Sequence, residues 1–404
     1  MSRKYLQNLA RVAPFILYAI MYYQNFPLSA KNLTVYSATR EYYLMLGCLL
    51  LIGLILVWPN SIENNVPPKD KHLSHYWLIS FSIFFCAMLT LAIYVNPHGR
   101  FPWNPYPFTT TAAHNQKINI YKKVDYQPEI VVLGSSHVYT VSAEYLSDVT
   151  GKSAFNMSVG GAGPVDELAL GRYVIDNSTE IPLLFMVEMV ATDLDTSVWQ
   201  YSMPLNLITY LPNRDRTPVL NSIFLDTLNM KSLTDSLFLL TNQDMAENIS
   251  FLSDGTGVQS GTRDYALSVK KQILPVYKRN TCNKLDEDGK KTTEELVTIA
   301  QAYKISLVFY RSPLNIEFFE HVDLNNWKYK KCQVLLSEYM SAITESNPNV
   351  FYMDLMYYEL VSLLRDKGYA DAQHLTPEAS NLVIDALLPA IDTGLKWAMN
   401  ARSR

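Results

Sequence analysis

The sequence predicts an α/β fold, a doubly wound parallel five-stranded sheet, preceded by an N-terminal transmembrane helical region. Two observations favour this class. After residue 128, short β-branched apolar runs alternate with helical patterns, as in consecutive βαβ units. Most of the long apolar runs of the 404-residue chain lie before residue 96. We therefore expect a membrane anchor followed by a water-exposed domain.

The predicted membrane anchor covers residues 1–95 and contains two or three spans. Residues 42–58 and 76–95 carry no charged side chain, and each is close to the roughly 20 residues that a transmembrane helix needs. Residues 12–28 are a weaker candidate because prolines and amides interrupt the apolar run. This segment could span the bilayer or lie at its interface.

Positive charges give the orientation of the anchor. Arg3, Lys4 and Arg11 precede the first candidate span, and Lys69 and Lys71 lie between the two stronger ones. Cytoplasmic loops carry such an excess of Lys and Arg. Lys31 and Arg40 in the intervening loop reduce the contrast. With three spans, the chain after residue 95 lies on the opposite side, which fits a bacterial inner (cytoplasmic) membrane protein with a periplasmic domain.

The remainder of the chain divides into a linker and one folded domain. Residues 96–127 contain four prolines among aromatic residues, which predicts a linker without regular helix. The domain covers residues 128–404. Its predicted strands are residues 129–133, 154–159, 182–190, 305–310 and 350–353, and its predicted helices are residues 142–148, 165–175, 293–303 and 334–344.

Residues 196–285 interrupt this alternation and are interpreted as an insertion. Scattered apolar residues lie among many polar ones there, with no clear strand pattern. Long insertions at the carboxyl edge of a sheet often shape a ligand site. An elaboration that only packs against the domain is the alternative.

Three polar segments follow predicted strands or precede the final helix, and together they suggest one chemistry. They are Gly134-Ser135-Ser136-His137, the glycine-rich segment 156–163, and Asp371-Ala372-Gln373-His374, which comes just before a helix that we expect Pro377 to open. A serine hydroxyl becomes a nucleophile when an imidazole takes its proton and a carboxylate orients that imidazole. His374 and Asp371 could supply these two groups, and the glycine segment could offer backbone amides to an oxyanion.

These segments resemble the blocks of the SGNH (GDSL-like) hydrolase superfamily, which implies a flavodoxin-like sheet. The resemblance covers residue 129 to the C-terminus. It places the nucleophile at Ser136, the second-block glycine at Gly161 with Gly160 as the alternative, and the final acid and base at Asp371 and His374. One block departs from the pattern, because residues 188–193 contain no asparagine. The oxyanion donors would then be the Ser136 and Gly161 amides.

The resemblance is to a membrane-anchored branch that modifies envelope polysaccharides. It implies a serine O-acyltransferase or esterase that adds or removes acyl groups, with acetyl the expected one. The implied partners are a cell-envelope glycan, an acyl donor, the lipid bilayer and a membrane-bound O-acyltransferase. The alternative is a catalytically inactive protein of the same fold that binds glycan or acts as a scaffold in a membrane complex. The absence of the third-block asparagine is consistent with this alternative.

The other polar residues have simpler interpretations. His137 could touch substrate, although a packed or solvated histidine is the more common case. Cys282 and Cys332 could form a disulfide in an oxidising compartment. The seven histidines show no metal-ligand spacing, so we expect no metal and no cofactor. With a net charge of −4 and no basic cluster, nucleic-acid binding is not expected.

Overall fold

The computed structural model divides the chain into two compact units. One comprises Met1–Val95 and Phe224–Leu240, and the other comprises Asn96–Ile223 and Thr241–Arg404. The residues that the structure describes are 88–103, 113–189, 203–211, 217–241, 249–259, 285–313, 315, 328–364, 368–370 and 374–404.

The larger unit is built on a five-stranded parallel sheet, as predicted. The strand order is β2-β1-β3-β6-β7, and every neighbouring pair runs parallel. This is the flavodoxin-like order, in which successive strands are added to one side of β1 and then to the other, so that the order of addition reverses between β1 and β3. The strands are β1 (Ile130–Leu133), β2 (Ala154–Asn156), β3 (Leu184–Glu188), β6 (Ser306–Arg311) and β7 (Val350–Asp354).

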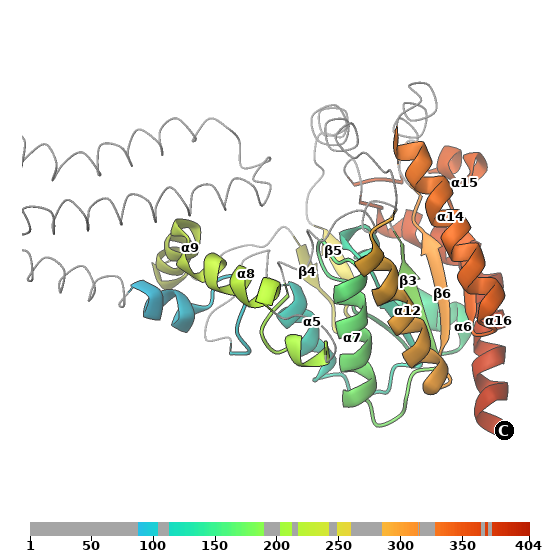
Figure 1. The fold of residues 1–404 in the computed structure, drawn as a ribbon, viewed down its shortest axis with the longest axis horizontal. Helices are drawn as coiled ribbons and strands as arrows, with labels where there is room; N and C mark the ends of the chain where they lie inside the picture. Colours follow the sequence, from blue (N-terminus) through green and yellow to red (C-terminus); the bar gives the residue numbers. More distant parts are fainter. Residues whose placement is uncertain are drawn as a thin grey trace, which may run out of the picture. The chain divides into compact units, whose positions relative to one another are not determined.

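Helices cover both faces of this sheet, which confirms the doubly wound class (Figure 1). All residues of β1, β2, β3 and β6 are buried, as expected for apolar strands between two helical layers. One apolar core contains side chains of α7, α12 and α14, and the other contains side chains of α6 and α16. These helices are α6 (Ala143–Thr150), α7 (Pro164–Asn177), α12 (Glu287–Ala302), α14 (Lys328–Ser346) and α16 (Pro377–Ser403).

The final helix, α16, opens as the sequence predicts. Pro377 is its first residue, and the Thr376 side chain caps it by accepting from the Ala379 amide. Proline is well suited to this position because its fixed φ is helical and its missing N–H has no intrahelical partner there.

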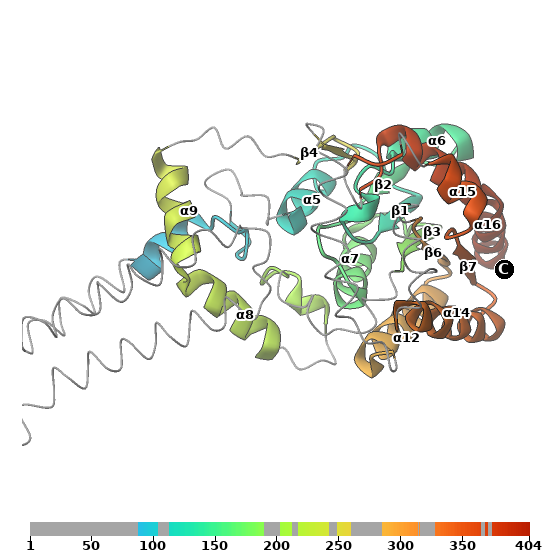
Figure 2. The same cartoon turned by 90° about the horizontal axis from the view of Figure 1, so that it is seen from above.

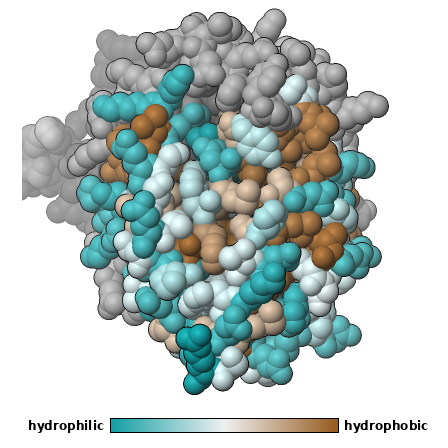
Figure 3. Space-filling model, turned by 90° about the vertical axis from the view of Figure 1, so that its right-hand side faces the viewer, coloured by the Kyte–Doolittle hydropathy of each residue, from teal (hydrophilic) through white to brown (hydrophobic). Residues whose placement is uncertain are grey.

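Hydrophilic and apolar side chains are interspersed on the face of the molecule shown in Figure 3.

The linker prediction for residues 96–127 is wrong over helix α5 (Ala113–Tyr121). Its four prolines all precede residue 108 and so leave this stretch free to form a helix. The Lys117 side chain is fully buried and donates hydrogen bonds to the Asn156 and Gly255 carbonyls. Burial lowers the pKa of Lys117 well below its usual value, against the opposing effect of Asp254. The helix therefore belongs to the folded core.

The insertion contains regular structure, although the sequence shows no clear strand pattern there. It includes the helices α8 (Thr217–Leu228) and α9 (Met230–Thr241), and the antiparallel hairpin of β4 (Ile249–Phe251) and β5 (Gly257–Gln259). The hairpin packs beside the end of β2, since the Asn156 amide donates to the Asp254 carbonyl and the Gly257 amide donates to the Tyr139 carbonyl. Figure 2 shows this hairpin at the edge of the sheet that carries β2.

The predicted spans fall almost wholly outside the described residues. Residues 12–28 and 42–58 lie outside them, and only residues 88–95 of the segment 76–95 are described, all of them as helix. Among the residues that the structure does describe, no helix combines the length and the apolar character needed to cross a bilayer.

Candidate active site

The turn after β1 carries the predicted nucleophile, Ser136, to the reversal point between β1 and β3. Gly134 ends the strand with φ +150°, and the Ser135 side chain caps a short 3₁₀ helix, Ser136–Val138, by accepting from the His137 amide. Ligand sites of open α/β sheets lie outside the carboxyl ends of the strands at such a point. The sheet therefore presents Ser136 where a substrate can reach it.

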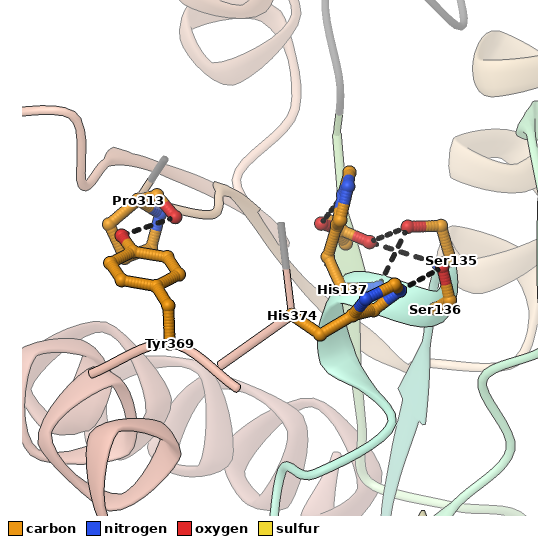
Figure 4. Close-up of polar contacts among 7 residues, drawn as sticks. Ser135, Ser136, His137, Pro313, Tyr369 and His374 are labelled. Carbon is orange, nitrogen blue, oxygen red and sulfur yellow. Dashed lines mark hydrogen bonds and ion pairs between the residues drawn. The ribbon is translucent and has the colours of Figure 1, made fainter. Parts of the chain in front are cut away.

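The structure brings Ser136 and His374 together. His374 Nε2 lies 2.9 Å from Ser136 Oγ, although the two residues are 238 positions apart in the chain (Figure 4). For Nε2 to accept the serine proton, the neutral ring must carry its own proton on Nδ1. The two side chains are then arranged as a nucleophile and its general base.

His374 is held by the short segment that precedes α16. The Ala370 amide donates to the His374 carbonyl at 2.8 Å, and the Thr376 amide donates to the Gly368 carbonyl at 2.9 Å. Thr140, just past the nucleophile turn, donates its hydroxyl proton to the Leu375 carbonyl at 3.0 Å. This last bond ties the base directly to the segment that carries the nucleophile.

A buried carboxylate, Glu188, lies beneath the nucleophile turn. Its Oε2 accepts from the Ser135 amide at 2.9 Å and from the Ser135 hydroxyl at 2.7 Å, and its Oε1 lies 3.1 Å from His137 Nδ1. Burial alone would raise the pKa of Glu188, but the charge of His137 and the hydrogen bonds from His137 and Ser135 outweigh it, so the pKa lies below its ordinary value. Glu188 is thus ionised at neutral pH.

Sequence analysis assigned no role to Glu188, although one signal for it exists. It is the only charged residue of the strand Leu184–Glu188, and it is 2% exposed. A charge that ends a fully buried strand needs a partner, because an unpaired buried carboxylate is strongly unfavourable. The candidate partners, Ser135 and His137, stand in the neighbouring block.

His137 packs beside the site, and its ring is tilted against that of His374 with 6.0 Å between the ring centroids. The side chain is 12% exposed and pairs with Glu188. This agrees with the expectation of a packed histidine. Part of the ring is exposed, so contact between His137 and the substrate stays a prediction.

The glycine-rich loop after β2 is bound to the nucleophile turn. The Val159 amide donates to the Gly134 carbonyl at 3.0 Å, and Gly161 adopts φ +67°, in the left-handed region that favours glycine. The amides of Ser136, Gly160 and Gly161 donate to no group in the described part of the chain. They are therefore available to an oxyanion, as the resemblance implies for Ser136 and Gly161.

A second buried pair holds the far end of this loop. His114 Nε2 lies 2.9 Å from Asp166 Oδ1, and Asp166 Oδ2 accepts from the Gly163 amide at 3.2 Å. Asp166 is fully buried in the first turn of α7. Helix α5 thereby helps to fix the loop that carries Gly160 and Gly161.

Two predicted residues lie outside the described part of the chain. Asp371 is one, so its role as the acid that orients His374 stays a prediction. Cys282 is the other; Cys332 is disulfide-bonded and buried, and its pairing with Cys282 stays a prediction too. Within the described residues no cluster of metal-ligating side chains occurs.

Comparison with known proteins found no matching family model and no matching curated protein. Similar solved structures include a GDSL-like lipase from Bacteroides thetaiotaomicron VPI-5482, with 9% identity, a TM-score of 0.35, and coverage of 70% of this chain and 98% of the other. Another is an acylhydrolase candidate from Bacteroides fragilis NCTC 9343, with 11% identity, a TM-score of 0.33, and coverage of 70% and 95%.

The resemblance to the SGNH superfamily extends from the sequence blocks to the fold of this chain. Its sheet has the expected order, and the turn with Ser136 follows the first strand of that sheet. His374 precedes the final helix and contacts Ser136.

The close approach of Gly134 to Glu188 leads to a first prediction. A Cβ at Gly134 would lie 2.6 Å from Glu188 Cβ and 2.9 Å from Val138 Cγ2, at a φ that side chains rarely adopt. Gly134→Ala should therefore destabilise the fold by more than the roughly 1–2 kcal/mol expected for a left-handed residue alone. The matched control is Gly151→Ala, at φ +65° with no atom within 4 Å. Equal unfolding midpoints for the two variants would contradict this packing.

The second prediction concerns the charge of Glu188. In Glu188→Gln the amide NH₂ must face one of the present donors, Ser135 or His137, so we expect a loss of roughly 2 kcal/mol in the free energy of unfolding. Glu180→Gln, on the exposed segment before β3, is the control and should unfold like the wild type. Denaturant unfolding of the full chain in detergent measures the difference.

The pH dependence of this difference has a definite sign. Because the pKa of Glu188 is lowered in the folded state, its contribution to stability is present above the ordinary glutamate pKa and is lost as pH falls through the lowered value. The difference in the free energy of unfolding between wild type and Glu188→Gln should thus be largest at neutral pH and vanish under acid conditions. A difference that stays constant down to the acid limit would show that the carboxylate charge is not the source.

Proposed function

We propose that this chain is a membrane-anchored serine O-acyltransferase or esterase that acts on acyl groups, with acetyl the expected one, of a cell-envelope polysaccharide. The observation that carries the proposal is the 2.9 Å contact of His374 Nε2 with Ser136 Oγ at the reversal point of the sheet. A serine whose hydroxyl meets an imidazole in this way can attack an acyl carbonyl. The envelope glycan and the membrane location rest on the sequence resemblance and the hydrophobic N-terminal segments.

The first half-reaction forms an acyl-serine. Ser136 Oγ bonds to the acyl carbon while its proton moves to His374 Nε2, and the carbonyl oxygen becomes an oxyanion that the amides of Ser136 and Gly161 would receive. The bond from the acyl carbon to the leaving oxygen then breaks, and the imidazolium gives its proton to that oxygen. The free alcohol of the donor departs.

The second half-reaction removes the acyl group. A hydroxyl, from water in an esterase or from a sugar in a transferase, gives its proton to His374 Nε2 and bonds to the acyl carbon. The bond to Ser136 Oγ breaks, and the proton returns to Ser136. Asp371 would orient His374 and balance the imidazolium charge in both halves. In the transferase version, the acyl donor is delivered by a membrane partner such as a membrane-bound O-acyltransferase.

The experiment is covalent labelling of the full-length chain with a fluorophosphonate probe, together with hydrolysis of a chromogenic acetyl ester. We expect an adduct on the peptide that carries Ser136. Ser136→Ala and His374→Ala should lose turnover by about 10⁴-fold or more. Ser403→Ala, at the exposed C-terminal end of α16, serves as the control and should label like the wild type.

Labelling needs neither an acyl acceptor nor a partner protein, so it also tests the alternative of an inactive scaffold. A wild-type chain that remains unlabelled, or one whose adduct persists in Ser136→Ala, would favour the scaffold and contradict an activated Ser136.

A further inference from the structure

Helices α8 and α9 bury several small hydroxyl side chains and leave several large apolar side chains exposed, although Val219, Ile223 and Leu239 are buried as well. The buried hydroxyl residues are Ser222, Thr227, Ser232 and Ser236, with exposures of 9%, 7%, 3% and 0%. The exposed ones within residues 224–240, which we call the outer apolar face, are Phe224 (53%), Leu237 (47%), Phe238 (44%) and Leu240 (39%).

An exposed face of large apolar side chains does not suit a helix that faces water. Surface helices of globular proteins turn their apolar stripe inward and their polar side outward. Helices in a bilayer place small residues, serine and threonine among them, at helix contacts, because lipid gives no hydrophobic drive between helices and close approach supplies the packing. Ser236 follows this pattern: it is fully buried, and its hydroxyl donates to the Ser232 carbonyl one turn earlier at 2.6 Å.

The outer apolar face lies within one compact unit, which contains the C-terminal part of α8 and nearly all of α9. Phe224–Leu240 forms one unit with Met1–Val95, the part of the chain that contains the two uncharged apolar segments 42–58 and 76–95. A lipid surface therefore accounts for the outer apolar face without any further component.

The length and the charges of α8 and α9 restrict how they could meet lipid. Each has 12 residues, which at about 1.5 Å per residue is well short of the roughly 30 Å hydrocarbon core. Lys231, 59% exposed at its side chain, lies 3.6 Å from Asp235 one turn on, so charge is retained beside the outer apolar face. Short helices with one apolar side and retained charge lie in the interface plane.

We propose that the outer apolar face of α8 and α9 lies at the boundary between the headgroups and the acyl chains of a phospholipid bilayer. This inference rests on the membrane anchorage that belongs to the proposed function. It gives α8 and α9 a lipid-binding role in place of shaping the ligand site. Because the face is apolar and its one described ion pair is internally balanced, lipid contact here should be insensitive to salt.

The test uses the full-length chain in vesicles of phosphatidylethanolamine and phosphatidylglycerol that contain a phospholipid with a photoactivatable diazirine near the start of its acyl chain. After irradiation, adducts are mapped by peptide mass spectrometry. We expect adducts within residues 217–241, at positions of the outer apolar face, as well as within residues 42–58 and 76–95. Raising the salt concentration should leave the yield within 217–241 unchanged.

Two variants sharpen the test. Phe224→Ser combined with Phe238→Ser should reduce the adducts within 217–241 several-fold and leave those of the N-terminal segments unchanged. Leu363→Ser is the matched control, since Leu363 is 67% exposed but belongs to the unit that carries the sheet, and it should alter no adduct. Fluorophosphonate labelling of Ser136 at the wild-type level shows that each variant is folded.

The outcomes separate this inference from the anchorage on which it rests. Adducts in the N-terminal segments but none within 217–241 would overturn the inference and leave the anchor standing, and the outer apolar face would then be assigned to a protein partner. Adducts in neither region would overturn both.

Discussion

The buried carboxylate of Glu188 is the interaction on which the rest of the site depends. A charge in a protein interior is tolerated only when hydrogen bonds and an opposite charge replace its lost hydration. Glu188 obtains these from two residues of a single turn, Ser135 and His137, which flank Ser136 on either side. The requirement to satisfy the carboxylate thus fixes both neighbours of the nucleophile. Gly134 supplies the remaining condition, because only a residue without Cβ lets the two strands approach so closely.

A fixed negative charge beneath the nucleophile has consequences for the neighbouring groups. The Tyr310 side chain is fully buried, and burial together with the charges of Glu188 and Glu167 raises its pKa well above the ordinary value, so it stays neutral. Because Glu188 bonds through the turn and not to His374, its charge positions Ser136 without taking the place of the acid that orients the base. Asp371, three residues before His374 in the sequence, stays the predicted acid for that role.

The fold followed from the sequence because four strands of its parallel sheet are fully buried. A strand that is covered on both faces has a short, continuously apolar sequence, and this pattern identified residues 130–133, 184–188 and 306–311. The helices that alternate with the strands predicted that the strands run parallel. Ser136 and His374 were proposed as a pair from two short motifs, and the structure places their side chains in contact. The helix α5 was missed because its apolar pattern is weak and its buried residues include His114, Asn115 and Lys117, which sequence reasoning assigns to the surface. Glu188 was missed because its partners are distant in sequence.

The insertion shows why a contiguous stretch of sequence need not have one role. Its hairpin β4–β5 belongs to the unit with the sheet and bonds to the Tyr139 carbonyl, four residues past Ser135. Its residues 224–240 belong instead to the unit with Met1–Val95. The chain therefore passes between the units at three points, after Val95, after Ile223 and after Leu240. The single insertion therefore contributes residues to both units.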